Sequence, residues 1–252
     1  MKARDWPEGY GRRVLAEVDS TNAEAMRIAD GLSGPEWILG LRQTRGRGRR
    51  GRAWADPAGN FSATLVLRPG ESPDQVALRS FVAALALYDA IAEAIGRTDC
   101  IALKWPNDVL LNGGKVAGIL LESAGMAGGR VRHLAIGIGV NLRSAPAGRD
   151  VETRALRPVA LLSEMGIEQT PEAFLDLLAL AYARREASFV TYGFAPIRAA
   201  WLERAARLGE VITARMARDE IAGVFETVDL NGNLVLNTAK GRVAIPAADV
   251  FF

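Results

Sequence analysis

The sequence predicts an α+β protein that ends in a small β-rich unit. Strand-like runs and helical patterns follow one another without the regular alternation that a doubly wound parallel sheet would show. From about residue 208 the pattern changes to short β-rich runs separated by turn signals, such as Asn-Gly-Asn at 231–233. With 252 residues, 49% of them hydrophobic, the chain can form one large core and a small second one. We therefore place a domain boundary between units 1–206 and 207–252.

The first part of the chain predicts three strands and one helix. These segments are the strands 12–20, 36–44 and 60–68 and the helix 20–32. Apolar residues recur at helical spacing in the helix, Thr21 and Glu24 have the spacing of a capping box, and Gly31 or Gly34 can end it. The alternation of apolar and polar residues in 60–68 predicts a half-buried strand.

The middle of the chain predicts a helix followed by several strands, and two more helices precede the C-terminal unit. The segments are helix 80–96, short strands within 101–124, strand 131–142, helix 171–193 and helix 195–205. Gly96 closes the first of these helices, while Thr170 and Pro171 open the second as N-cap and first helical residue. The Asn-Gly-Gly segment at 112–114 is a strong hairpin signal.

Arginine and glycine alone make up the segment from Arg45 to Arg52, between the second and third predicted strands. Glycine lets backbone N–H groups turn toward an anion, and arginine forms bidentate bonds to phosphate or carboxylate. The formal net charge of the chain is only +2, so the positive charge is local to this Arg/Gly loop. The composition equally fits a flexible solvated loop or an RNA-binding tract. The brevity of the loop, its internal position and the adjacent Trp54 favour a phosphate-bearing ligand.

Three other motifs place polar groups at the ends of predicted elements. They are DSTN at 19–22, KWPND at 104–108 followed by GGKVAG at 113–118, and GIGVN at 137–141. The first lies at a helix N-terminus, where free N–H groups favour a polar ligand, and the strand glycines of the last mark a close backbone approach. Taken singly, DSTN is more often a helix cap and the two lysines are more often surface residues. Together the motifs predict a site that works by positioning and electrostatics.

Composition disfavours several other classes of site. The one cysteine, Cys100, is expected to be a buried thiol, and the one histidine, His133, is expected to be structural. The sequence shows no Ser-His-Asp set and no metal-ligand pattern, so we predict that the protein itself holds no metal. Because no apolar signal core or membrane-length apolar stretch is present, the cytoplasm is the expected location.

Five motifs in a fixed order identify a family: VDSTN, GRGRRGRAW, KWPND, GKVAGILLE and GIGVNL. In this order and at these separations they resemble biotin protein ligase, also called biotin-acetyl-CoA-carboxylase ligase or holocarboxylase synthetase, over nearly the whole chain. The resemblance implies a catalytic domain built on a mixed sheet, 1–206, followed by a small SH3-like β-barrel, 207–252. About a dozen residues precede the first strand, too few for a helix-turn-helix, which indicates a monofunctional ligase without specific DNA binding. Ligases of this type are often dimers, so a homodimer is expected.

The implied reaction uses ATP with Mg²⁺ and has two steps. The carboxylate of biotin attacks the α-phosphorus to give biotinyl-5'-AMP and pyrophosphate. A lysine of a biotin carboxyl carrier protein then attacks this anhydride and releases AMP. The implied partners are biotin, ATP and the carrier protein of a biotin-dependent carboxylase, with no membrane. The Arg/Gly loop is expected to be disordered until both ligands arrive and then to fold over them, which shields the anhydride from water.

The resemblance also assigns residues to the site. Biotin contacts are assigned to Ser20, Thr21, Asn22, Gln43, Arg47, Gly48, Arg49, Lys115, Gly118 and Leu120. Nucleotide contacts are assigned to Arg47, Arg49, Arg52, Trp54, Lys104, Asn107 and Asn141. The implied catalytic residues are Lys115 at the biotin carboxyl and α-phosphate, Arg49 steadying charge on that phosphate, and Asp108 accepting the proton of the attacking lysine.

Two alternatives are left open. A lipoate-type acyl ligase shares the fold and the adenylation chemistry, but its Gly-rich signature differs from the Arg/Gly loop and KWPND of this chain. A nucleic-acid-binding module using residues 45–52 would show steep salt dependence of binding and no ATP turnover. The last segment, VAIPAADVFF, lacks the Gly-Glu turn that is common near the C-terminus of the family.

Overall fold

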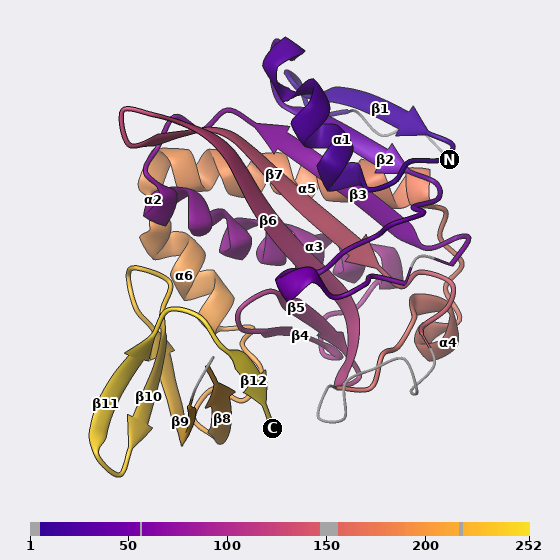
Figure 1. Ribbon diagram of the computed structural model, residues 1–252. Helices are drawn as coiled ribbons and strands as arrows, with labels where there is room; N and C mark the ends of the chain where they lie inside the picture. The colour runs from indigo at the N-terminus through magenta and orange to yellow at the C-terminus, as the bar shows by residue number, and fades with distance from the viewer. Residues whose placement is uncertain (1–5, 56, 147–155, 217–218) are drawn as a thin grey trace.

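The computed structural model describes residues 6–55, 57–146, 156–216 and 219–252 (Figure 1). In chain order the elements of the first unit are β1 (Gly11–Leu15), α1 (Thr21–Ile28), η1 (Ala29–Gly31), β2 (Glu36–Gly40), η2 (Arg49–Gly51), β3 (Phe61–Leu67), α2 (Pro73–Ala77), α3 (Arg79–Ile95), β4 (Ile101–Lys104), β5 (Asp108–Leu111), β6 (Gly114–Ala127), β7 (Arg130–Val140), α4 (Leu161–Met165), α5 (Pro171–Tyr192) and α6 (Phe194–Leu202). The C-terminal unit contains β8 (Val211–Arg215), β9 (Glu220–Val228), β10 (Leu234–Thr238), β11 (Gly241–Ile245) and β12 (Asp249–Phe251).

The strands of the described residues form a seven-stranded sheet and a five-stranded sheet. The larger has the order β1-β2-β3-β7-β6-β5-β4, and the smaller has the order β11-β10-β9-β8-β12. β1 and β2 run parallel, whereas the other neighbouring strands are antiparallel. The predicted mixed sheet with a separate C-terminal β unit is therefore confirmed. The boundary at 206/207 stays a prediction.

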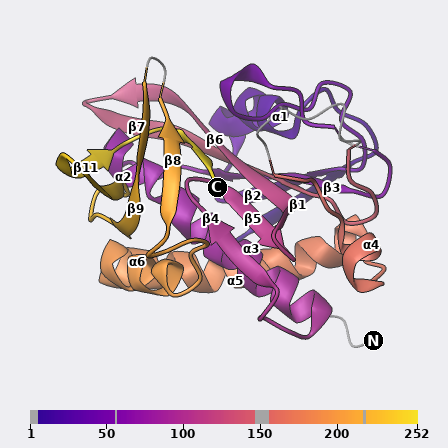
Figure 2. The same cartoon turned by 90° about the horizontal axis from the view of Figure 1, so that it is seen from below.

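Helices cover both faces of the larger sheet, as Figure 2 shows. On one face α5 meets the sheet through edge-to-face ring contacts, with centroids 5.9 Å apart for Trp37 and Tyr182 and 5.1 Å apart for Phe61 and Phe174. α3 lies on the same side and packs against α5. On the opposite face the small residues of α1 pack on a second apolar cluster that includes Val66. The polar motifs of the sequence lie on this α1 face.

The prediction that strand 60–68 is half-buried is wrong. Every residue of β3 is buried, including the polar Ser62 and Thr64. The strand lies in the interior of the sheet between β2 and β7, and helices cover it from both sides. Alternate side chains of β3 point to opposite faces of the sheet, and both faces are buried. The polar side chains lie on the α1 face.

The predicted capping box of α1 is also wrong. Ser20 is the N-cap, it makes no side-chain capping hydrogen bond, and Thr21 is already helical. The hydroxyl of Thr21 is within 3.1 Å of Gln43 Oε1, so a contact between distant segments takes the place of a local cap. The regular α-helix ends at Ile28, and a 3₁₀ turn continues to Gly31. α2 and α4 were not predicted from the sequence.

The C-terminal unit packs closely on the first unit at the turn around Gly232. The indole N–H of Trp105 donates to the carbonyl of Gly232 at 3.1 Å, and a Cβ at this glycine would lie 3.0 Å from both Leu78 and Phe81. Arg198 of α6 donates to the carbonyl of Val228 in β9. Buried residues of both units belong to one continuous apolar cluster. The smaller sheet is thereby held at a fixed place beside the larger one.

The structure tests the expectations for Cys100 and His133. Cys100 is half-buried, so the expectation of a buried thiol is wrong; it precedes β4, the edge strand of the larger sheet, where less of the chain covers it. His133 is buried, with Nε2 2.9 Å from Asp30 Oδ1, which agrees with a structural role. Among the described residues, no helix has the length and apolar character needed to cross a membrane.

Candidate active site

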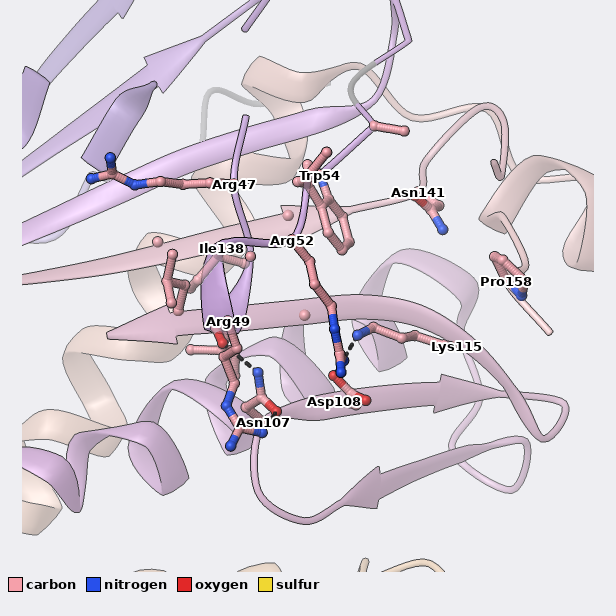
Figure 3. A pocket seen from close by; sticks show the side chains of 18 of the residues that line it. Arg47, Arg49, Arg52, Trp54, Asn107, Asp108, Lys115, Ile138, Asn141 and Pro158 are labelled. Carbon is pink, nitrogen blue, oxygen red and sulfur yellow. Dashed lines mark hydrogen bonds and ion pairs between the residues drawn. The ribbon is translucent and has the colours of Figure 1, made fainter. Parts of the chain in front are cut away.

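A cavity of about 660 Å³ opens on the α1 face of the larger sheet, beneath the Arg/Gly loop (Figure 3). The residues that the sequence assigned to contacts or catalysis all line it: Ser20, Thr21, Asn22, Gln43, Arg47, Gly48, Arg49, Arg52, Trp54, Lys104, Asn107, Asp108, Lys115, Gly118, Leu120 and Asn141. They come from six separate segments of the chain. Their assembly in one place fits the assignment, while the individual contacts stay predictions.

Glycines form the floor of the cavity. Gly118 of β6 is paired with Gly139 of β7, and Gly137 faces the same side because side chains alternate along a strand. A Cβ at Gly137 would lie 2.2 Å from Asn22 Oδ1, and a Cβ at Gly139 would lie 2.4 Å from Cε2 of Trp54. These two strand glycines are therefore required for the close approach of side chains from α1 and from the Arg/Gly loop.

One end of the cavity consists of neutral, hydrogen-bonded side chains, and we call it the hydrogen-bonding end. It is lined by Ser20, Thr21, Asn22 and Gln43, and includes the buried Thr64, which is hydrogen-bonded to two of them. The backbone N–H of Thr21 donates to Gln43 Oε1 at 2.8 Å, and Thr64 Oγ1 is 2.6 Å from Asn22 Oδ1 and 2.8 Å from Thr21 Oγ1. Thr21, Asn22 and Thr64 are each at most 4% exposed. Since buried polar groups are costly unless they are paired, this network fixes the positions of its members.

The other end is charged, and we call it the ionic end. It contains Arg49, Lys104, Asp108 and Lys115. Lys104 and Asp108 are paired across the β4–β5 hairpin, and Asp108 forms ion pairs with Lys115 Nζ at 2.7 Å and Lys104 Nζ at 3.7 Å. Figure 3 shows Lys115 directed at Asp108 and Arg49 bonded to Asn107, with Arg47 apart from them. Three cations around one carboxylate leave this end positively charged.

Burial and neighbouring charges shift the pKa values of the ionic end. Burial alone would raise the pKa of the Asp108 carboxyl, but Lys115 and Lys104 outweigh it and the pKa is lowered. Burial lowers the pKa of Lys104, with Asp108 acting against the shift, and burial also lowers the pKa of Arg49. Asp108 therefore stays ionised and holds the lysines in place, and its lowered pKa makes it a weak proton acceptor.

The Arg/Gly loop forms a short hairpin over the cavity. Backbone bonds join Trp54 N to Gly46 O and Gly48 N to Arg52 O, and Arg50 lies at the tip with a positive φ of 55°. The indole of Trp54 rests on the glycine floor, with the Nζ of Lys115 5.9 Å from the ring centroid. The loop thus supplies an aromatic wall between the two ends. That ligands order this loop stays a prediction.

A carboxylate of the C-terminal unit holds the tip of the loop. Asp249 of β12 forms ion pairs with Arg50 at 2.8 Å, Arg52 at 3.1 Å and Arg215 at 3.4 Å. Burial would raise the pKa of Asp249, but Arg52 and the other arginines lower it overall. The C-terminal unit is therefore part of the cavity wall.

Sequence reasoning missed four polar residues of the site: Ser62 and Asp249, which line the cavity, and Thr64 and Glu122, which bond to Asn22. Glu122 Oε2 accepts from Asn22 Nδ2 at 2.7 Å and from Arg47 Nη2 at 3.0 Å. A signal for Glu122 was present, because it follows Gly118 and Leu120 at alternate positions of one strand face. Thr64 could be assigned to the site only with the strand register of β3, which the sequence does not show. No local sequence pattern marks Asp249 as a residue of the site. Within the part of the chain that the structure describes, no cluster of His, Cys, Asp and Glu could hold a metal.

Known proteins match this chain over most of its length. The model of the Biotin/lipoate A/B protein ligase family matches residues 14–141, and that of the Biotin protein ligase C terminal domain matches residues 208–252. The biotin–[acetyl-CoA-carboxylase] ligase of Paracoccus denitrificans is 59% identical over 239 residues, which cover 95% of this chain and 99% of that protein. The bifunctional ligase/repressor BirA of Bacillus subtilis is 33% identical over 92% of this chain and 71% of its own length.

A solved structure shows the same architecture. The biotin protein ligase from Aquifex aeolicus in complex with biotin and ATP superposes with a TM-score of 0.80 at 25% identity. The match covers 95% of this chain and 98% of that one.

Proposed function

The chain belongs to the biotin/lipoate A/B protein ligase family, and we propose that the cavity beneath the Arg/Gly loop is where it joins biotin to ATP. The enzyme activates biotin with ATP and Mg²⁺ to biotinyl-5'-AMP and transfers biotin to a lysine of the carboxylase's biotin carboxyl carrier domain. One observation carries the assignment of the cavity: its two ends differ in chemistry as the two ends of the ligands do. A neutral ureido ring suits the hydrogen-bonding end, and a carboxylate with phosphates suits the ionic end.

In the first step, two anionic groups must approach each other. An oxygen of the biotin carboxylate forms a bond to the α-phosphorus, the bond to the bridging oxygen breaks, and pyrophosphate leaves. Lys115 and Arg49 offset the charge that gathers on the α-phosphate. Both are positioned in advance, Lys115 by Asp108 at 2.7 Å and Arg49 by Asn107 at 3.1 Å, so little reorganisation is needed during the reaction.

In the second step, the amine of the acceptor lysine attacks the carbonyl carbon of the anhydride. The bond from that carbon to the phosphate oxygen breaks, AMP leaves, and the attacking nitrogen gives up a proton. The lowered pKa of Asp108 supports a role in holding Lys104 and Lys115, and its action as the proton acceptor stays a prediction. Trp54 and the Arg/Gly loop exclude water from the anhydride while the acceptor approaches.

An ATP–pyrophosphate exchange assay tests the function. The purified protein is supplied with biotin, with lipoate or with no acid, and we expect exchange with biotin alone. Exchange with lipoate alone would establish the lipoate-type alternative. Absence of exchange together with salt-sensitive binding of nucleic acid would support the nucleic-acid-binding alternative.

The role of Arg49 has a separate readout. Arg49→Ala should release biotinyl-5'-AMP into solution faster than the parent, because the loop then lacks a charge that holds the phosphate. Chase experiments with preformed, labelled adenylate measure this rate, and an unchanged rate would contradict the assignment. Formation of a homodimer, lack of specific DNA binding and a cytoplasmic location stay predictions.

A further inference from the structure

On the basis of the function proposed above, we propose that Glu122 is a positioning residue that sets the donor and acceptor directions of the hydrogen-bonding end, and hence its affinity for the ureido ring. Glu122 lies on β6, on the face that also carries Gly118 and Leu120. Its side chain is 33% exposed and contacts Asn22 and Arg47, which line the cavity. It is outside the set of residues that the sequence assigned to the site.

The carboxylate of Glu122 determines how the Asn22 amide is turned. A carboxylate accepts hydrogen bonds and has no proton to donate, so the group 2.7 Å from Glu122 Oε2 must be the amide nitrogen of Asn22. The amide oxygen of Asn22 then faces Thr64 Oγ1, 2.6 Å away, and must accept the proton of that hydroxyl. Glu122, which is outside the buried network, thus fixes the orientation of the buried Asn22 amide.

Thr21 lies next to this chain of hydrogen bonds. A hydroxyl has one proton, and that of Thr64 is committed to Asn22. Thr21 Oγ1, 2.8 Å from Thr64 Oγ1, donates its own proton to Gln43 Oε1 at 3.1 Å. Two hydrogen bonds therefore run in one direction, from Thr64 through Asn22 to Glu122.

This direction suits a ureido group. Thr21 Oγ1, having donated its proton, keeps lone pairs that can accept from a ureido N–H. Asn22 Nδ2 keeps a second hydrogen, whose protein neighbour, Leu120 O, is 3.4 Å away and forms a weak bond at most. A ring that has both N–H donors and a carbonyl acceptor needs partners of both kinds. Reversing the Asn22 amide would replace this donor with an oxygen and would lower the affinity for such a ring.

Glu122 also connects the ureido end to the Arg/Gly loop. Its Oε2 accepts from Arg47 Nη2 at 3.0 Å, so one oxygen atom serves both α1 and the loop. Two donors that point at the same atom require an oxygen there. A glutamine at position 122 can meet this requirement with its carbonyl oxygen, whereas a methionine cannot.

The test compares Glu122→Met with Glu122→Gln in biotin-dependent ATP–pyrophosphate exchange and in calorimetric binding of biotin without ATP. For Glu122→Met we expect the KM and the Kd for biotin to rise about tenfold, which corresponds to about 1.4 kcal/mol, with kcat and the KM for ATP within about twofold. Glu122→Gln should stay within about threefold of the parent, because its oxygen keeps the direction of the network.

A matched control and a second variant complete the design. Glu164 also accepts from an asparagine amide and an arginine, Asn112 at 3.1 Å and Arg157 at 2.9 Å. Neither of these partners lines the cavity, whereas Asn22 and Arg47 do, so Glu164→Met should leave biotin binding unchanged. Thr64→Val interrupts the same relay without touching Arg47. It should weaken biotin binding in the same sense, and it serves as the test should Glu122→Met fail to fold.

Several outcomes would overturn the inference. One is parent-like biotin binding in Glu122→Met. Another is an equal loss of biotin affinity in Glu122→Met and Glu122→Gln, which would make charge the cause. A third is a parallel fall of Tm, biotin affinity and ATP affinity in Glu122→Met. If the parent itself shows no biotin-dependent exchange, the proposed function fails and this inference fails with it. If the parent is active and Glu122→Met binds biotin as tightly as the parent, only the role of Glu122 is refuted.

Discussion

The two ends of the cavity solve different problems with different chemistry. At the hydrogen-bonding end, neutral side chains such as Thr21, Asn22 and Thr64 are nearly inaccessible to solvent, and hydrogen bonds join them. At the ionic end, Lys115 keeps 33% of its side chain exposed and acts through charge. Directional bonds between buried neutral groups discriminate by shape and polarity, whereas charges tolerate movement of the reacting atoms. We infer that selection of the acid and activation of the acid are separated in space.

The largest expected effect comes from removing the central cation of the ionic end. Lys115→Ala should lower kcat for biotin-dependent pyrophosphate exchange about 100-fold or more, the usual loss when one group that stabilises transition-state charge is removed. The Kd for biotin should change much less, because the hydrogen-bonding end is untouched. Exchange kinetics and calorimetry measure the two quantities. The exposed Lys240 provides the control, Lys240→Ala, and a parent-like rate in Lys115→Ala would refute the division of labour.

A pair of glycine substitutions, two residues apart on one strand face, probes both ends with the same chemical change. In Gly137→Ala the new methyl group would overlap Asn22, so the KM for biotin should rise about tenfold with the KM for ATP little changed. In Gly139→Ala it would overlap the Trp54 indole, so the KM for ATP should rise by a similar factor. Steady-state exchange kinetics of both variants measure the effects. Equal changes in both constants for both variants would show that the ends are not independent.

A smaller effect is expected at the contact between the loop and the C-terminal unit. Asp249→Asn removes the charge that holds Arg50 and Arg52 and should raise the KM for ATP about fivefold; the arginines are 42% and 49% exposed, so solvent screens the loss. Asp176 forms an exposed ion pair with Arg12 at 2.7 Å, and Asp176→Asn is the control. An ATP affinity equal to that of the parent in Asp249→Asn would show that the loop is held by other contacts.

The smallest effect is confined to acid solution and concerns stability. Because the pKa of Asp108 is lower in the folded protein than its usual 3.8, its ion pairs stabilise the fold fully above that value, and the stabilisation is lost as the pH falls through the lowered pKa. The difference in unfolding free energy between the parent and Asp108→Asn should therefore be constant from about pH 7 to pH 5 and smaller at about pH 3. Urea titrations at these pH values measure it, and an undiminished difference at pH 3 would refute the expectation.

The sequence predicted most of the polar residues that line the cavity, but it did not predict the hydrogen bonds and ion pairs among them. The motifs bring residues from Ser20 to Asn141 to one place, because each lies at an end of a strand or helix or in the loop between β2 and β3. They did not reveal Thr64, since the face to which a strand residue points depends on register and on which helix covers that face. Asp249 reaches the loop from a separate sheet, and no local pattern encodes such a contact.

Two of the errors, on β3 and on the cap of α1, have the same origin. The half-buried interpretation of β3 assumed that polar side chains face water, but α1 and the loop cover that face. The capping box assigned Thr21 a local role, whereas its hydroxyl serves the network that includes Gln43 and Thr64. In both cases contacts between distant segments overrode a local preference, and both cases lie at the site.

The glycine floor limits how the enzyme can be redesigned. Gly118, Gly137 and Gly139 leave bare main chain beneath the ligands, and no natural residue is smaller than glycine. Substitution at these positions can only shrink the available space, so it can exclude acids but cannot admit bulkier ones. Room for a larger vitamin analogue must come from the roof, where Trp54 and the arginines lie, and any such gain would open the reactive anhydride to water.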